Sequence, residues 1–223
     1  MAKVQKKSKG KKRNRLPGRA TTPQEIKMLL QACGKGPAGL RNAAFIALCA
    51  GAGLRCFEAL EVLPSHIEKI GNGTTIRVIR GKGGKSRIVA LMDEFKPFID
   101  LWIERRKNLE IGGRSPLICG ITRSEKENSL GGQRNTFGKH VSTALMRSTI
   151  KRLAKNAGIE TRVHIHGLRH SMATAWVASG IELRAISQQL GHVCPSTTDS
   201  YLGKITANRL ISAASEVKMF TSQ

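Results

Sequence analysis

The sequence predicts an α+β fold that is mainly helical and has one small antiparallel sheet. Most of the chain places apolar residues at helical spacing, bounded by capping residues and glycines. Residues 74–91 instead alternate β-branched and polar residues around a Gly-rich turn, which is typical of a hairpin. The length of 223 residues suits one domain, placed here at residues 21–223 after a basic, disordered tail at residues 1–20.

The first helices are indicated by their start signals. Thr22 is the expected N-cap, Pro23 fits the first turn, and Glu25 completes a capping box. A second helix at residues 40–50 is apolar on nearly all sides, so we expect it at the centre of the core. After a Gly-rich break, residues 55–60 form a third, short helix.

The hairpin is expected to pair residues 74–80 with residues 86–91. Residues 111–135 are expected to be a loop, apart from one candidate strand at residues 116–119. Helical periodicity returns in five further segments, at residues 93–107, 141–157, 167–179, 182–190 and 207–220. Gly191 is expected to end the helix at residues 182–190.

The charge of the chain points to a polyanionic partner. Lys and Arg number 38 against 15 Asp and Glu, for a formal charge of +23, which favours nucleic acid over an anionic membrane surface. Residues 1–20 hold nine of these cations and no acid. This tail, including Lys11, Lys12 and Arg13, is expected to contact DNA phosphates, with a merely solvated tail as the alternative. An aromatic content of 4% argues against a base-stacking platform for single strands.

Other classes fit the composition poorly. No apolar run reaches the roughly 18 residues that a transmembrane helix needs, and no secretion signal precedes the basic tail. The expected location is therefore cytoplasmic, in association with DNA. The five cysteines form no CxxC pair, so they are expected to be reduced thiols without a zinc ribbon.

A set of residues that could cleave a phosphodiester is spread along the chain. Cleavage needs a nucleophile, cations on the non-bridging oxygens, and a proton for the leaving oxygen. Each residue alone has an ordinary structural explanation, so the interpretation rests on their order and spacing. The set consists of Arg55, Lys82, His166, Arg169, His192 and Tyr201, the last being the single tyrosine of the chain.

Together these residues resemble the active site of the tyrosine recombinase, or phage integrase, family. The matching segments are Gly-Leu-Arg55 with Glu58, Lys82 in GKGGKSR, HGLRH at residues 166–170, Leu-Gly-His192, and Tyr201 nine residues later. The resemblance covers residues 22 to about 210 and implies the DNA breaking–rejoining fold. It further suggests a short form, a catalytic domain without the separate N-terminal DNA-binding domain of many members, whose place the tail would take.

The resemblance also implies a role for each residue. Arg55 and Arg169 would clamp the phosphate, since a guanidinium is always charged and forks onto two oxygens. Lys82 would be the general acid, with Lys85 as its nearest rival, and His166 would be the base or orienter for Tyr201. His192 would hydrogen-bond a phosphoryl oxygen.

Lys85 and Arg87 are expected to contact DNA phosphates rather than take part in the reaction. The chemistry needs no ATP, cofactor or metal, because arginines take the place of a cation. His166 and His170 have a spacing that can bind zinc, but Arg169 on the same face disfavours a metal site.

The expected function is site-specific recombination of double-stranded DNA through a 3′-phosphotyrosyl link, in integration, excision or inversion. Two alternatives stay open: a type IB topoisomerase-like nicking–closing enzyme and a catalytically inactive DNA-binding protein. Strand exchange needs two duplexes cut at two sites each, so a homotetramer on paired sites is expected, with accessory DNA-bending proteins as further partners. By analogy with relatives, the amphipathic C-terminal segment is expected to dock on a neighbouring protomer.

Overall fold

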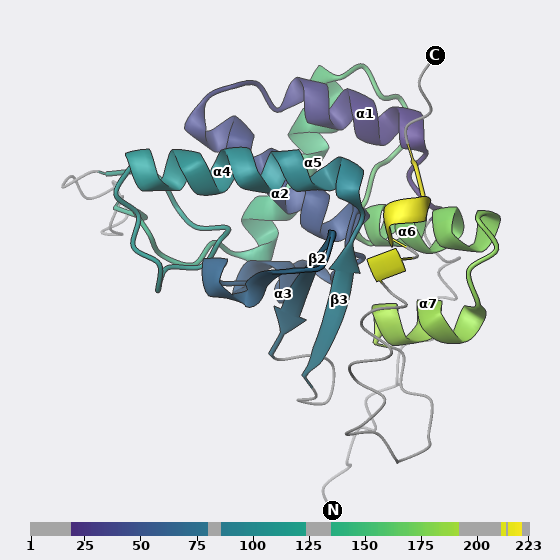
Figure 1. The fold of residues 1–223 in the computed structure, drawn as a ribbon. Coiled ribbons are helices and arrows are strands. Elements are labelled where there is room, and N and C mark those ends of the chain that lie inside the picture. The colour runs from purple at the N-terminus through teal and green to yellow at the C-terminus, as the bar shows by residue number, and fades with distance from the viewer. Residues whose placement is uncertain (1–18, 80–85, 124–134, 192–210, 213, 220–223) are drawn as a thin grey trace, which may run out of the picture.

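The computed structural model describes residues 19–79, 86–123, 135–191, 211–212 and 214–219. Within these residues the fold is mainly helical with a three-stranded antiparallel sheet, which confirms the predicted class (Figure 1). The helices are α1 (Pro23–Ala32), α2 (Pro37–Ala50), α3 (Cys56–Glu61), α4 (Lys96–Asn108), α5 (Thr143–Asn156), α6 (Ile165–Ala178) and α7 (Leu183–Leu190). The strands are β1 (Ile67–Ile70), β2 (Gly73–Val78) and β3 (Arg87–Leu91), with short 3-10 turns at Pro64–His66 and Asp93–Phe95.

Helix α1 begins at the predicted cap. The Glu25 N–H donates to the Thr22 hydroxyl at 3.2 Å, and the Glu25 carboxylate accepts the Thr22 N–H at 2.9 Å. The preceding residues already belong to the folded body: the Arg19 guanidinium bonds Glu25 and Thr161, and the Thr21 N–H donates to the Gly167 carbonyl at 3.2 Å. These contacts fix the start of α1 against the start of α6.

Helix α2 is the centre of the core, as its apolar sequence predicts. Residues 41–50 are all buried, and the helix packs against α1, α3, α4 and α6 (Figure 1). The helix ends at Gly51, where a side chain would not fit, since a Cβ would come within 2.6 Å of the Phe95 ring. The turn that follows leads directly to α3.

The predicted hairpin is present, and its sheet has one more strand than expected. β2 pairs with β3 in the register Val78↔Arg87, and β1 adds to the other edge of β2 with Ile67 opposite Ile76. β1 was missed because four residues, IEKI, are too few to show an alternating pattern. The turn at residues 81–85 lies outside the described residues.

The strand predicted at residues 116–119 was wrong. This segment contributes only an isolated bridge between Cys119 and His140. Its carbonyls are taken by α4 side chains instead: Trp102 Nε1 donates to Leu117 O at 2.7 Å and Arg106 Nη1 to Pro116 O at 2.6 Å. A backbone satisfied in this way does not need a neighbouring strand.

The last described residues pack against their own chain. Ala214, Val217 and Met219 are buried, and the Met219 N–H donates to the Glu94 carboxylate at 2.8 Å. Ile211 lies so close to Gly73 on β2 that a Cβ there would come within 2.0 Å of it. The described part of the C-terminal segment therefore packs on its own chain, and docking on a neighbouring protomer stays a prediction. Among the residues that the structure describes, no helix is long and apolar enough to cross a membrane.

Candidate active site

Arg55 is brought to the site by the turn between α2 and α3. The turn passes through Gly53, whose φ of +67° lies in the left-handed region that favours glycine. Glycine is also needed for space, because a Cβ on Gly53 would come within 2.2 Å of the Met172 side chain on α6. The turn thereby places Arg55 at the N-terminal end of α3, close to α6.

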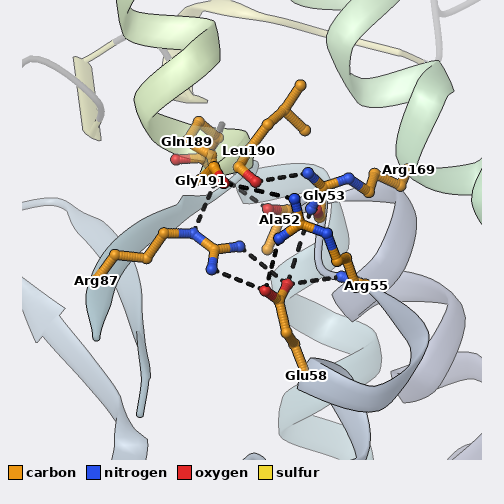
Figure 2. A network of polar contacts seen from close by, with 9 residues as sticks. All are labelled: Ala52, Gly53, Arg55, Glu58, Arg87, Arg169, Gln189, Leu190 and Gly191. Atoms are coloured by element: carbon orange, nitrogen blue, oxygen red, sulfur yellow. Dashed lines mark hydrogen bonds and ion pairs between the residues drawn. The ribbon is translucent and has the colours of Figure 1, made fainter. Parts of the chain in front are cut away.

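Glu58 is the centre of an ion cluster, and its side chain is fully buried (Figure 2). Its carboxylate accepts the backbone N–H of Arg55 at 2.8 Å and Arg55 Nη1 at 2.9 Å. Arg87 on β3 donates Nη1 to one carboxylate oxygen and Nη2 to the other, both at 2.9 Å. Arg169 Nη1 lies 3.7 Å from the same carboxylate.

The buried carboxylate of Glu58 stays ionised. Burial alone would raise the pKa of Glu58, but the hydrogen bonds from Arg87 and Arg55 outweigh it and hold the pKa below its ordinary value. Three guanidinium groups around one carboxylate leave the cluster with a net charge of +2. This net positive charge can attract a phosphate.

The C-terminal end of α7 closes the cluster from the other side (Figure 2). The last carbonyls of a helix have no partner within the helix and carry partial negative charge. Each of the three arginines donates to one of them: Arg87 Nε to Gln189 O at 3.3 Å, Arg169 Nη2 to Leu190 O at 2.5 Å and Arg55 Nη2 to Gly191 O at 3.4 Å. Gly191 ends the helix with φ of +61°, as predicted.

Arg169 is the more buried of the two predicted clamp residues, with a side chain 4% exposed against 20% for Arg55. It also donates to the Gly53 carbonyl at 2.6 Å, so it ties α6 to the turn that carries Arg55. Burial, followed by the charge of Arg55, lowers the pKa of Arg169 to about 10. The group therefore remains a cation at neutral pH.

A basic groove leads to these arginines. It has a volume of about 1230 Å³, and Arg55, His166 and Arg169 are among the residues that line it. Helix α5 and the segment between α5 and α6 line the rest of it, and their charged residues there are Arg147, Lys151, Lys155, Arg162 and the acid Glu160. The groove can thus hold a phosphate backbone with one of its phosphates next to the arginine pair.

His166 is exposed in this groove, one turn of α6 before Arg169. Partial burial and then the charge of Arg169 lower its pKa below the ordinary value of 6.5. At neutral pH the imidazole is therefore uncharged, which is the form that accepts a proton or a hydrogen bond.

If His166 acts as a base, kcat/KM for DNA cleavage should fall as the pH falls through its pKa, which lies below 6.5. The neutral form is the active one, so activity is retained above this pKa and lost beneath it. Cleavage rates at limiting DNA, from about pH 5 to about pH 8, measure the acid limb. A limb at 6.5 or above, or an unchanged limb in His166→Asn, would contradict this role.

The structure brings together three of the six predicted catalytic residues. Arg55, His166 and Arg169 come from α3 and α6 and share the groove. The other three, Lys82, His192 and Tyr201, lie outside the described residues, as do the predicted DNA contacts Lys11, Lys12, Arg13 and Lys85. The roles of these residues therefore stay predictions.

The zinc alternative gains no support from the geometry. The rings of His166 and His170 lie edge to face with centroids 5.9 Å apart. Among the described residues, no group of three His, Cys, Asp or Glu side chains is placed to hold a metal ion. The charge of Arg169 next to His166 further disfavours a cation there.

Sequence reasoning missed the role of two residues in this cluster. Glu58, named from the sequence as part of the Arg55 motif, caps its own helix and also joins α3 to β3 and α6. Gln189 is buried and gives its whole amide to backbone groups of Ala52 and Ala90. A Glu three residues after Arg55 was a visible capping signal, whereas nothing in the sequence marked Gln189.

Solved structures show which class of protein has this fold. The XerH site-specific recombinase, solved bound to its palindromic difH substrate, matches 83% of this chain and 49% of its own, with a TM-score of 0.63 and 22% identity. A lambda integrase tetramer bound to a Holliday junction matches 84% of this chain and 51% of its own, with a TM-score of 0.53 and 20% identity. The fold is that of the catalytic domain of tyrosine recombinases.

Sequence comparisons agree with the fold. Residues 19–207 match the model of the phage integrase family. Tyrosine recombinase XerC of Rhizobium meliloti is 34% identical over 170 residues, 76% of this chain and 48% of the relative. Tyrosine recombinase XerD of Xanthomonas axonopodis pv. citri is 32% identical over 193 residues, 82% and 57% respectively. The chain belongs to the phage integrase family, and it spans about half the length of the curated relatives it matches.

Proposed function

We propose that this chain is the catalytic part of a site-specific DNA recombinase that cuts and rejoins duplex DNA through a 3′-phosphotyrosyl intermediate. The observation that carries the proposal is the convergence of Arg55 and Arg169 at the end of a basic groove. Both are held by one buried carboxylate and one helix C-terminus, in a chain of the phage integrase family.

The proposed reaction follows from what each residue can do. The Tyr201 hydroxyl attacks the scissile phosphorus, an O–P bond to tyrosine forms, and the bond to the 5′-oxygen breaks. Because a tyrosine hydroxyl has a pKa near 10, His166 takes its proton or orients it. Lys82 protonates the leaving 5′-oxygen, with Lys85 as the rival acid.

The remaining groups stabilise the charge of the transition state. Arg55 and Arg169 bind the two non-bridging oxygens, and His192 donates a hydrogen bond to one of them. The energy of the cleaved bond is kept in the phosphotyrosine, so a 5′-hydroxyl of another strand can reverse the step without ATP.

The proposed partner is double-stranded DNA, bound by a homotetramer on paired sites. The tetramer of lambda integrase on a Holliday junction supports this assembly by fold, and the groove supports the DNA contact. Arg19, the first described residue, bonds Thr161, which lines the groove, and the preceding tail with Lys11, Lys12 and Arg13 is proposed to contact DNA phosphates. We place its action on nucleoid DNA of the cytoplasm, with DNA-bending proteins as accessory factors.

The test begins with the protein and a pool of host and mobile-element DNA. Denaturing the mixture and sequencing the DNA that stays covalently attached should return one short shared sequence. Two plasmids carrying that sequence should then yield reciprocal recombinants. Efficient relaxation of plasmids without the sequence, and no recombinants, would favour the topoisomerase-like alternative. Salt-sensitive binding without any adduct would favour an inactive DNA-binding protein.

A further inference from the structure

Arg87 has an environment that does not fit a DNA phosphate contact. Unlike Arg55 and Arg169, it is not among the residues that line the groove. All three guanidinium nitrogens already donate: Nη1 and Nη2 to the two oxygens of Glu58 at 2.9 Å each, and Nε to the Gln189 carbonyl at 3.3 Å. A bidentate pair with a buried carboxylate is among the strongest hydrogen-bonded ion pairs. Binding a phosphate would require breaking it.

Arg87 connects three elements that each carry or adjoin a proposed catalytic residue (Figure 2). It is the first residue of β3 and pairs with Val78, so it stands at the base of the hairpin whose turn contains Lys82. It donates to the Glu58 carboxylate, which also binds Arg55, and it donates to the Gln189 carbonyl at the end of α7.

The contact with α7 is tight at the residue before His192. A Cβ on Gly191 would come within 2.9 Å of the Arg87 guanidinium carbon, so the glycine lets the guanidinium lie against the helix end. The same helix end is joined to β3 a second time. Gln189 Nε2 donates to Ala90 O at 2.7 Å and to Ala52 O at 3.0 Å, and its Oε1 accepts the Ala90 N–H at 3.0 Å.

Arg87 supplies two of the hydrogen bonds that the Glu58 carboxylate accepts. With Arg87 present, Glu58 has two further hydrogen bonds, and Arg169 stays 3.7 Å from the carboxylate. Without it, the carboxylate would be left with Arg55 alone at hydrogen-bond distance and would draw Arg169 in. Both clamp residues would then be held by Glu58 rather than presented to the phosphate.

We infer that Arg87 is a positioning residue for the proposed cleavage reaction, acting through Glu58 and the end of α7, and not a phosphate contact. The inference rests on the proposed function. It predicts that Arg87 sets the rate of cleavage by bound protein and leaves the affinity for DNA nearly unchanged. If Arg87 contacted a phosphate, its replacement would instead weaken DNA binding. It would also lower the slope of log K against log salt concentration by about one.

The experiment compares wild type with Arg87→Lys, Arg87→Met, Glu58→Gln and the double variant Arg87→Met with Glu58→Gln. The double variant leaves no unpaired buried carboxylate, so it covers the case in which Arg87→Met fails to fold. The readouts are the single-turnover rate of covalent adduct formation at saturating DNA, and the DNA Kd at several salt concentrations. The matched control is Arg77→Lys. Arg77 is an exposed arginine on β2 that pairs with Glu68 of β1.

We expect Arg87→Lys to form adduct about tenfold to a hundredfold more slowly, with Kd and salt slope within about twofold of wild type. The losses from Arg87→Met and Glu58→Gln should not add in the double variant, because both act on one ion pair. Arg77→Lys should match wild type.

Two results would overturn the inference while the proposed function stands. The first is a wild-type adduct rate in Arg87→Lys, whether or not binding is weaker. The second is additive losses in the double variant. A wild type that forms no adduct at all would instead overturn the proposed function, and with it the role of Arg87.

Discussion

Glu58→Gln is expected to lower the free energy of unfolding by about 3–5 kcal/mol, the largest stability effect that we expect from a single substitution in this chain. The side chain is fully buried, and its charge compensates three guanidinium groups. Glutamine keeps the shape but leaves these cations facing one another, and its amide can accept on one atom only. Chemical denaturation at neutral pH measures the difference.

The matched control for Glu58→Gln is Glu61→Gln on the same helix, where the acid is exposed and should change stability by less than about 0.5 kcal/mol. The pH dependence of the free energy of unfolding gives a second check. Because the folded-state pKa of Glu58 is lowered, its contribution is present above the unfolded pKa and lost as the pH falls through the folded one. Equal stability of wild type and Glu58→Gln at neutral pH would contradict the account.

Arg169→Lys is expected to slow DNA cleavage about 100- to 1,000-fold, or about 2.7–4 kcal/mol, while DNA binding is largely retained. Lysine keeps a positive charge, so attraction of the duplex persists. It loses the planar fork, which here ties Gly53 O at 2.6 Å and Leu190 O at 2.5 Å while facing the groove. The measurement is the single-turnover cleavage rate at saturating DNA.

The control for Arg169→Lys is the same exchange at Arg77, which is exposed and paired with Glu68 outside the cluster. The variant should also be shown to be folded at the assay temperature, because Arg169 is buried. A cleavage rate within about threefold of wild type in a folded Arg169→Lys protein would mean that the fork is not part of the clamp.

Local signals predicted much of the fold. The capping box at Thr22, the apolar run in α2 and the glycine that ends α7 each depend on residues close in sequence, and the structure confirms them. Predictions failed where distant partners decide. β1 exists because β2 offers it an edge, and residues 116–119 form no strand because side chains of α4 and α2 take carbonyls of this segment.

The candidate site likewise has features that local sequence predicts and features that depend on distant partners. Arg55 and Arg169 could be found from motif order, and the structure brings them together with His166. The cluster that holds them could not be predicted, since Arg87 is 29 residues from Glu58 and 102 residues from Gln189. Whether an arginine binds a phosphate or a buried carboxylate depends on such tertiary neighbours. The sequence next to Arg87 does not distinguish the two roles.

The central claim is that Tyr201, the single tyrosine of this chain, carries the broken strand. The direct measurement uses a nicked duplex of the target sequence, from which the cleaved end diffuses away, and compares wild type with Tyr201→Phe. Wild type should accumulate a protease-sensitive adduct whose mass places a 3′-phosphate on Tyr201 and leaves a free 5′-hydroxyl, and Tyr201→Phe should bind the DNA but form no adduct. An equal amount of adduct in Tyr201→Phe, or a 5′-phosphate link at another residue, would contradict the account.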